Sequence, residues 1–267
     1  MPIQNVVVNC TDVPRSVEYY TRFLELEVVG EVTADRAVLD AVTATIELRV
    51  VPNGREHSTW SPDDLQKGFR HIGFKVDRLD ERADALKAGG VEFKLDPLNA
   101  EGNVRICFFY DPDGTLLELI QGDLRYAEVL DADGVARERA LGVPQRPRFD
   151  HVAITVEDRD ATSDFYHRHH GFDFIGTIEQ PHDSRGFHIG YLKGGDTVLE
   201  VFTYDVPKTA RDPQLDVAGF AYAELAGDVP DLPVQIAHDE TKVYVDPDGF
   251  AYAVGSDGFA YAVGSGA

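Results

Sequence analysis

The feature that most constrains this chain is an internal repeat. Residues 5–12 form an apolar, β-branched run that leads into the amphipathic segment 13–24, and about 146 residues later the run 151–158 leads into a similar segment, 159–168. Each run predicts a strand, and each amphipathic segment predicts a helix, because an aspartate stands at each junction as an N-cap and an aromatic pair falls on the buried helix face. Self-similarity at this spacing predicts a fold built from copies of one unit.

Two weaker copies complete the pattern. One begins at 70–77 and continues into the amphipathic stretch 79–88, which ends at a glycine pair typical of helix termini. The other begins at 219–225, and the segment after it contains prolines that leave little room for a helix. Three β-rich segments follow each start. We therefore expect four βαβββ modules, numbered one to four, with Pro-Asp-Gly turns near the ends of modules two and four.

The repeats divide the chain into expected domains. Residues 1–121 would form an N-terminal domain of modules one and two, and residues 149–256 a C-terminal domain of modules three and four. The charged segment 122–148, with its glycine and prolines, is expected to link them, and a short hairpin is expected within it at 126–135. Residues 257–267 form a tail that largely duplicates the preceding nine residues, and no function is assigned to it.

Composition excludes several classes of partner. The chain has 47 Asp and Glu against 25 Lys and Arg, a formal charge of −22, which would repel both nucleic acid and anionic membranes. The N-terminus shows no targeting or membrane-spanning segment, so we expect a cytoplasmic protein. Cys10 and Cys107 lie in strand-like runs and are expected to be reduced core thiols rather than a disulfide.

Four segments, in order, resemble the vicinal oxygen chelate superfamily, which includes glyoxalase I, extradiol dioxygenases and bleomycin-binding proteins. Residues 13–24 resemble the family's opening helix, and 45–48, 71–74 and 111–120 resemble three further landmarks of small bacterial glyoxalases. The resemblance covers most of the chain. It implies an α+β fold in which four βαβββ modules form two domains of curved mixed sheets, or glyoxalase-like cups, with helices packed outside.

The resemblance also implies a set of metal ligands. In the family, each module offers one ligand from its first strand and one carboxylate from its last strand, both facing into a cup. The corresponding pairs, from module one to module four, are Asn5 and Glu47, His71 and Glu118, His151 and Glu200, and Gly219 and Ala253. The last pair cannot bind a metal through side chains.

The pairing of modules decides which ligands meet. If modules two and three face each other, the site holds two His and two Glu: His71, Glu118, His151 and Glu200. Glu47 then faces a cup without partners. If modules pair in sequence, one site has Asn5 in place of a His and the other is half empty. We favour the first pairing, because Asn is a poor metal ligand and the second pairing leaves polar side chains stranded.

These ligands suit one divalent ion, and side chains alone do not choose among Zn²⁺, Ni²⁺, Mn²⁺, Co²⁺ and Fe²⁺. Two open positions on the ion would accept neighbouring oxygens of a small-molecule substrate. By resemblance to glyoxalase I, Glu118 or Glu200 would be the catalytic base that moves a proton next to a carbonyl. We expect a metal-dependent, glyoxalase I-like lyase or isomerase that acts as a monomer or a homodimer.

Two other functions stay open. A non-catalytic protein, like the bleomycin-binding ones, would use the cups as apolar clefts for a drug or another small ligand. An extradiol ring-cleaving dioxygenase would need two His and one Glu in modules three and four, where Gly219 and Ala253 leave gaps. If the protein is a lyase, a glutathione adduct is not favoured as its substrate over an adduct of another thiol or a different substrate with two neighbouring oxygens. The Arg and Asn that grip it in glyoxalase I are replaced here by Asn9 or Thr155 and by Val51 or Tyr204.

Overall fold

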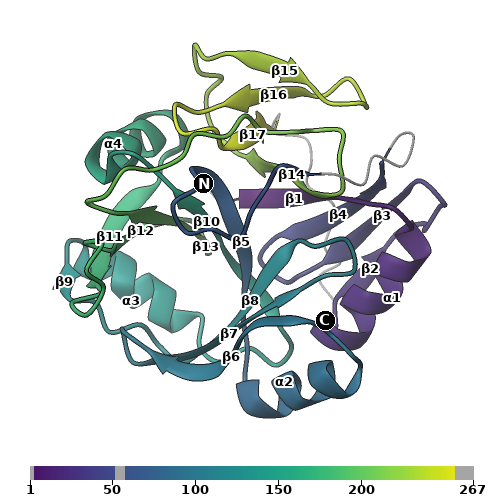
Figure 1. Ribbon diagram of the computed structural model, residues 1–267, viewed down its shortest axis with the longest axis horizontal. Coiled ribbons are helices and arrows are strands. Elements are labelled where there is room, and N and C mark those ends of the chain that lie inside the picture. The colour runs from purple at the N-terminus through teal and green to yellow at the C-terminus, as the bar shows by residue number, and fades with distance from the viewer. Residues whose placement is uncertain (1–2, 52–57, 256–267) are drawn as a thin grey trace.

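The computed structural model describes residues 3–51 and 58–255, which form two mixed β-sheets with helices around them (Figure 1). The duplicated tail expected at 257–267 lies outside these residues. In the part of the chain described, no helix is both long and apolar enough to cross a membrane. Three of the four helices in this part, residues 13–24, 79–88 and 159–170, lie at the periphery of Figure 1, and the fourth, residues 132–140, lies farther inside.

The four modules predicted by the repeat are present. Module one consists of β1 (Ile3–Cys10), α1 (Val13–Leu24), β2 (Glu27–Val29), β3 (Arg36–Asp40) and β4 (Thr45–Val50). Module two consists of β5 (Gly68–Lys75), α2 (Leu79–Ala88), β6 (Phe93–Ala100), β7 (Val104–Tyr110) and β8 (Leu116–Gln121). Module three consists of β10 (Arg148–Thr155), α4 (Arg159–His170), β11 (Asp173–Glu179), β12 (His188–Gly194) and β13 (Thr197–Thr203). Module four has no helix and consists of β14 (Gly219–Leu225), β15 (Val234–Ile236), β16 (Lys242–Val245) and β17 (Ala251–Val254).

Each sheet joins one module from each half of the chain. The eight-stranded sheet has the order β15-β16-β17-β14-β1-β4-β3-β2, so module four pairs with module one. The nine-stranded sheet has the order β6-β7-β8-β5-β10-β13-β12-β11-β9, so module two pairs with module three. The favoured pairing is confirmed. The ranges 1–121 and 149–256 each supply strands to both sheets, and their status as separate domains stays a prediction.

The linker differs from the expected hairpin. Its strand β9 (Glu128–Val129) pairs with β11 at the edge of the nine-stranded sheet, and helix α3 (Ala132–Ala140) follows. The hairpin prediction at 126–135 was wrong because Asp131 caps this helix, its side chain accepting a hydrogen bond from the backbone N–H of Asp133. The linker thus extends one sheet rather than merely connecting two domains.

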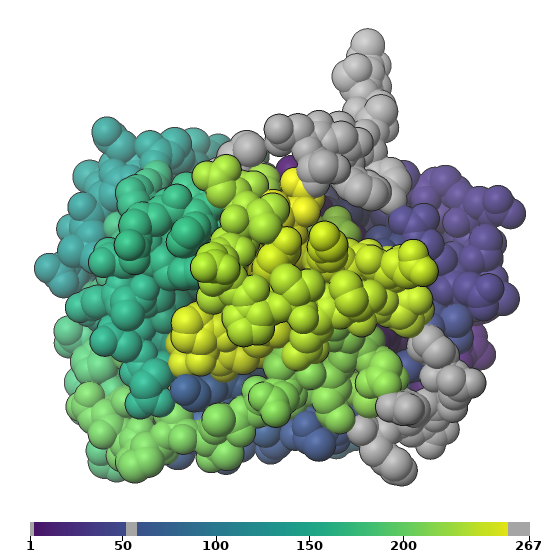
Figure 2. All heavy atoms as spheres, turned by 90° about the horizontal axis from the view of Figure 1, so that it is seen from above, coloured from purple at the N-terminus to yellow at the C-terminus, as the bar shows by residue number. Residues whose placement is uncertain are grey.

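One face of each sheet packs into a shared core, and the other lines a cup. Val6, Ile72, Val152 and Ala223 come from the four central strands and belong to one buried cluster. Figure 2 shows the C-terminal residues, in yellow, lying between the purple residues of module one and the teal residues of the middle of the chain. The opposite faces carry separate clusters, one in each cup. Because successive side chains of a strand point to opposite faces of the sheet, neighbouring residues divide between the core and a cup.

The two Pro-Asp-Gly turns hold helices in place. In the turn between β7 and β8, Asp111 accepts backbone hydrogen bonds from Asp113 and Thr115, and its other oxygen accepts a 2.9 Å bond from the hydroxyl of Tyr20 on α1. In the turn between β16 and β17, Asp246 is bonded in the same way, with a 2.8 Å bond from Tyr166 on α4. These contacts join module one to two and module three to four, across the two sheets.

We expect Tyr20→Phe and Tyr166→Phe each to lower the free energy of unfolding by about 1–3 kcal/mol, because each leaves a buried carboxylate oxygen without its donor. Chemical denaturation followed by circular dichroism measures the change. Tyr252→Phe is the matched control, because the hydroxyl of Tyr252 is buried and has no hydrogen-bond partner among the described residues. Equal losses in all three variants would contradict the assigned role of the turns.

Candidate metal centre

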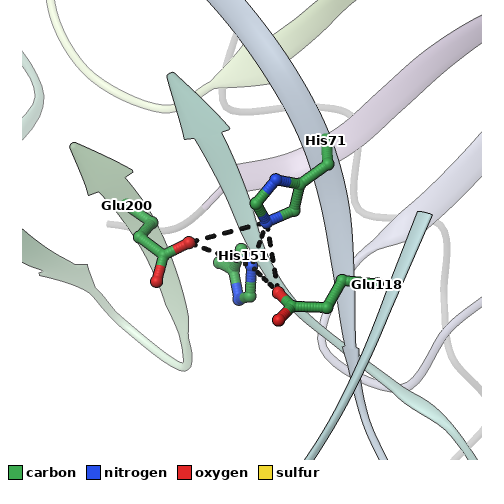
Figure 3. A group of neighbouring side chains, drawn as sticks. All are labelled: His71, Glu118, His151 and Glu200. Carbon is green, nitrogen blue, oxygen red and sulfur yellow. Dashed lines mark hydrogen bonds and ion pairs between the residues drawn. The ribbon is translucent and has the colours of Figure 1, made fainter. Parts of the chain in front are cut away.

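Four buried side chains meet in the middle of the nine-stranded sheet. They come from its four adjacent central strands: His71 from β5, Glu118 from β8, His151 from β10 and Glu200 from β13. One ligand atom from each lies within 4.8 Å of all the others, and Figure 3 shows the side chains directed toward one point. The structure therefore brings together all four candidate ligands that the sequence placed in modules two and three.

Strand register explains the convergence. On antiparallel β5 and β10, His71 lies opposite Ala153 and His151 lies opposite Gly73, so the two imidazoles are related symmetrically. In the parallel pairs, Gly73 lies beside Glu118 and Ala153 lies beside Glu200. Gly73 is needed for this arrangement, because a Cβ built there would lie 2.1 Å from Cε1 of His151.

Each histidine follows a residue that interrupts the strand register. Arg70 on β5 and Asp150 on β10 have no partner in the ladder, the pattern of a β-bulge. The extra residue shifts by one position the alternation of side chains between the two faces of the strand. Phe69 and Ile72 therefore both belong to the core, while His71 faces the cup. Both histidines are thereby turned into one cup.

The distances fit a shared cation. Nε2 of His71 and Nε2 of His151 are 3.0 Å apart, and Oε2 of Glu118 is 3.1 and 2.9 Å from them. Oε2 of Glu200 is 3.5 and 3.4 Å from the same two nitrogens. Ligand atoms about 2 Å from one ion are separated by roughly these distances. Among the described residues, no Lys or Arg forms an ion pair with either glutamate, so the imidazoles are the only ion-pair partners of these two buried carboxylates there.

The charges of these groups depend on one another. Burial alone would lower the pKa of His151, but the charge of Glu200 and hydrogen bonds to Asp150 and Glu118 raise the pKa well above its ordinary value. Burial alone would raise the pKa of Glu118, but hydrogen bonds from His151 and His71 lower it to about 2. Without a metal, the cluster therefore holds a proton on imidazole beside ionised carboxylate, a proton that a divalent ion would displace.

The two halves of the site are not equivalent. Asp150 lies 3.0 Å from Nδ1 of His151, whereas Nδ1 of His71 is buried and has no partner among the described residues. Tyr191 on β12 lies opposite Glu200, and burial together with the charge of that carboxylate raises the pKa of Tyr191. The equivalent position opposite Glu118 is Phe108, which offers no hydroxyl. The sequence analysis did not identify Asp150 as part of the site.

The four side chains lie beside a cavity of about 530 Å³ that Glu118 and Glu200 help to line. Its walls are largely apolar and aromatic. They include Leu95, Ile106, Phe108, Ile120, Phe187, Ile189, Phe202 and Tyr204. A small organic molecule fits a cavity of this size.

The second cup, between modules one and four, has a different chemistry. Register places Tyr222, not Gly219, at the position equivalent to the histidines, because the bulge residue on β14 is Ala221. The assignment of Gly219 was therefore wrong, whereas Ala253 does lie at the expected place, opposite Glu224. With Asn5 and Glu47, this cup has one carboxylate and no histidine at the four positions.

Glu47 does have partners, contrary to expectation. Nε of Arg49 donates to Oε1 of Glu47 at 2.8 Å, Nε of Arg36 donates to the same oxygen, and Asn5 donates to the other oxygen at 3.2 Å. Arg49 also pairs with Asp239. Burial alone would raise the pKa of Glu47, but the hydrogen bonds from Arg36 and Arg49 lower it. Guanidinium groups thus supply the positive charge in this cup.

We expect Asp150→Ala to weaken metal binding by about 10–100-fold, because the carboxylate that fixes the ring orientation and tautomer of His151 is lost. Asp150→Asn keeps a hydrogen-bond acceptor, so its affinity for the metal should lie between that of Asp150→Ala and that of the wild type. Isothermal titration calorimetry with Zn²⁺ measures the affinities. Asp80→Asn, which removes an exposed carboxylate paired with Arg105, is the control. Equal affinities in all four proteins would contradict the role of Asp150.

Known proteins resemble this chain in sequence and in fold. The family model described as Glyoxalase/Bleomycin resistance protein/Dioxygenase superfamily matches residues 3–119 and 148–255. The uncharacterized protein YwkD of Bacillus subtilis is 30% identical over 128 residues, which are 45% of this chain and 95% of that protein. A probable lactoylglutathione lyase of Vibrio cholerae is 28% identical over 137 residues, 47% of this chain and 94% of that protein. Glyoxalase I from Zea mays is 19% identical with a TM-score of 0.62, covering 95% of this chain and 91% of that one, a likeness of fold alone.

Proposed function

Because this chain belongs to the Glyoxalase/Bleomycin resistance protein/Dioxygenase superfamily, we propose that it is a metal-dependent enzyme of the glyoxalase I-like lyase or isomerase type. It would bind one divalent ion through His71, Glu118, His151 and Glu200 and move a proton next to a carbonyl of a small oxygenated substrate. The observation that carries the proposal is the convergence of these four buried ligands beside a cavity.

A bound divalent ion would supply Lewis-acid polarisation of two neighbouring substrate oxygens. The chain's own residues do the rest. A glutamate takes the proton from the carbon next to the carbonyl and returns it to the adjacent carbon. The apolar walls of the cavity exclude water from this step, which favours proton return over exchange with solvent.

The asymmetry of the site favours Glu118 as the moving base. The phenol of Tyr191 lies opposite Glu200, so Glu200 has a polar neighbour that can restrain it at the cluster. Glu118 faces the ring of Phe108, and among the described residues its carboxylate has polar side-chain contacts only with the two histidines of the cluster. It is therefore freer to turn toward a substrate. Glu200 remains the second candidate for this role.

The glutathione adduct named for the Vibrio cholerae relative is not the substrate proposed here. Of the positions at which glyoxalase I would grip glutathione, Thr155 donates to the backbone carbonyl of Asp64 at 3.0 Å. Tyr204 is buried and stacks on Phe187, with ring centroids 4.7 Å apart. Thr155 is thus engaged within the protein, and Tyr204 lines the cavity with an aromatic ring in place of an Asn amide, so the grip on glutathione expected of glyoxalase I is not reproduced.

We expect metal analysis of the purified protein to find about one divalent ion per chain, as four nitrogen and oxygen ligands around one point require. The double variant His71→Ala with His151→Ala should lose the ion, and Glu47→Ala should keep it, because arginines already neutralise Glu47. Plasma mass spectrometry measures the content. Loss of metal in the Glu47 variant, or none in the wild type, would contradict the proposal, and the second outcome would favour a non-catalytic binding protein.

We also expect the metal-loaded protein in D₂O to exchange the carbon-bound hydrogens of an α-hydroxyketone such as hydroxyacetone, or of a hemithioacetal, at a low but measurable rate by proton NMR. Glu118→Gln should lower the rate by about 10²–10⁴-fold, because a positioned general base is lost. Glu101→Gln, a change at another glutamate that lines the same cavity, should have little effect. If hydrogen–deuterium exchange persists in Glu118→Gln and stops in Glu200→Gln, Glu200 is the base and Glu118 is the restrained ligand.

A further inference from the structure

One side of the cavity beside the candidate metal centre carries two cationic side chains. Arg70 and Lys94 both line it, and Arg70 is the bulge residue immediately before His71. The guanidinium carbon of Arg70 lies 5.2 Å from the ring centre of Phe202, and that ring centre lies 5.8 Å from the ring centre of His71. A single aromatic ring therefore separates the cation from the cluster.

The positive charges there outnumber the carboxylate that pairs with them. Asp64 accepts from Arg70 at 2.6 Å and from Arg185 at 3.3 Å, and it lies 3.5 Å from the ammonium of Lys94. Arg185 pairs more closely with Asp183, at 2.7 Å. The Asp64 carboxylate is thus shared by Arg70 and Lys94, which line the cavity, and by Arg185.

Arg70 is not fully satisfied, whereas the ammonium of Lys94 also donates to the backbone carbonyl of Pro62 at 2.7 Å. The Arg70 side chain is only 7% exposed, so water has little access to it. Its Nε atom is buried and has no hydrogen-bond partner among the described residues. Burial and the neighbouring charge of Arg70 together lower the pKa of Lys94, although Asp64 raises it. Both groups would gain from an added negative charge, because a partly desolvated cation lacks its hydration.

The remaining charges of the cavity do not already supply that anion. Apart from Asp64 and the two candidate ligands, the acidic side chain lining it is Glu101, in the turn between β6 and β7. Within the described residues, Glu101 forms no ion pair with Arg70 or Lys94. In a chain of formal charge −22, this is a locally positive spot inside an apolar cavity.

We propose that the substrate of this site carries a carboxylate that binds Arg70 and Lys94 while its vicinal oxygens lie at the four-ligand cluster. A short apolar segment would join the two ends and pass the rings of Phe108 and Phe202. This inference rests on the proposed function, since it uses the cluster as the anchor for the other end of the molecule. It adds the substrate class: a small carboxylic acid with a second, chelating end.

The test uses metal-chelating probes in matched pairs. Alkyl hydroxamates bind an accessible divalent ion through two neighbouring oxygens, and the monohydroxamates of succinic and glutaric acid add a distal carboxylate to the same chain. Isothermal titration calorimetry of the Ni²⁺-loaded protein should show that the carboxylate probe of the better-fitting length binds at least about tenfold more tightly than the size-matched butano- or pentanohydroxamate, ~1.4 kcal/mol.

Variants then assign the preference to residues. In Arg70→Gln and in Lys94→Gln the preference for the carboxylate probe should fall several-fold, while affinity for the neutral hydroxamate stays unchanged. Arg70→Lys, which keeps the charge, should restore part of the preference. Arg105→Gln is the matched control, because Arg105 pairs with Asp80 and does not line the cavity. If Arg70→Gln fails to fold, the affinities of Lys94→Gln for the two probes alone test the assignment of the carboxylate site.

The outcomes separate this inference from the proposed function. Failure of every hydroxamate to bind the metal-loaded wild type would mean that the cluster holds no accessible ion, and the proposed function would fail. Equal binding of charged and neutral probes would leave the metal centre in place and overturn the carboxylate site. A preference that persists in both Arg70→Gln and Lys94→Gln would overturn it as well.

Discussion

The antiparallel pairing of β5 with β10 is the interaction on which the site depends. These strands come from different halves of the chain, and their register sets His71 opposite Ala153 and His151 opposite Gly73. A slip of one residue would turn each imidazole to the core face. The small residues opposite the rings matter equally, because the imidazoles occupy the volume that larger side chains would fill. The parallel neighbours β8 and β13 then add one carboxylate each.

The two cups show two ways to balance buried negative charge. In the cup of modules two and three, two carboxylates face two imidazoles with no lysine or arginine paired to them in the described part of the chain. In the cup of modules one and four, Glu47 is already neutralised by Arg36 and Arg49. A buried carboxylate needs a compensating charge. In the first cup a bound cation would meet that need, whereas the second cup meets it with its own side chains.

Local signals made much of this fold predictable. The helix expected at 79–88 is α2, because a glycine pair ends it, and the helix expected at 13–24 is α1, capped by Asp12. The four cluster residues could be named because the resemblance to the vicinal oxygen chelate superfamily implies one ligand on the first strand and one on the last strand of each module, and the repeat located these strands. Features that depend on strand pairing could not be predicted. A bulge leaves no mark in composition, so Tyr222 was missed in favour of Gly219. The arginines around Glu47 were missed because the sequence argument counted only the ligand positions and not the neighbours that share their face.

The covalent joining of the halves has a consequence for how the two cups change over time. When two identical half-length chains associate about a twofold axis, every substitution appears in both of their shared sites. In this chain the cups are encoded by different segments, so the guanidinium groups of the second cup arise without touching the histidines of the first. Asp150 and Tyr191 likewise stand on one side of their site only. Because each cup draws on its own strands, a substitution in one cup leaves the ligand positions of the other unchanged.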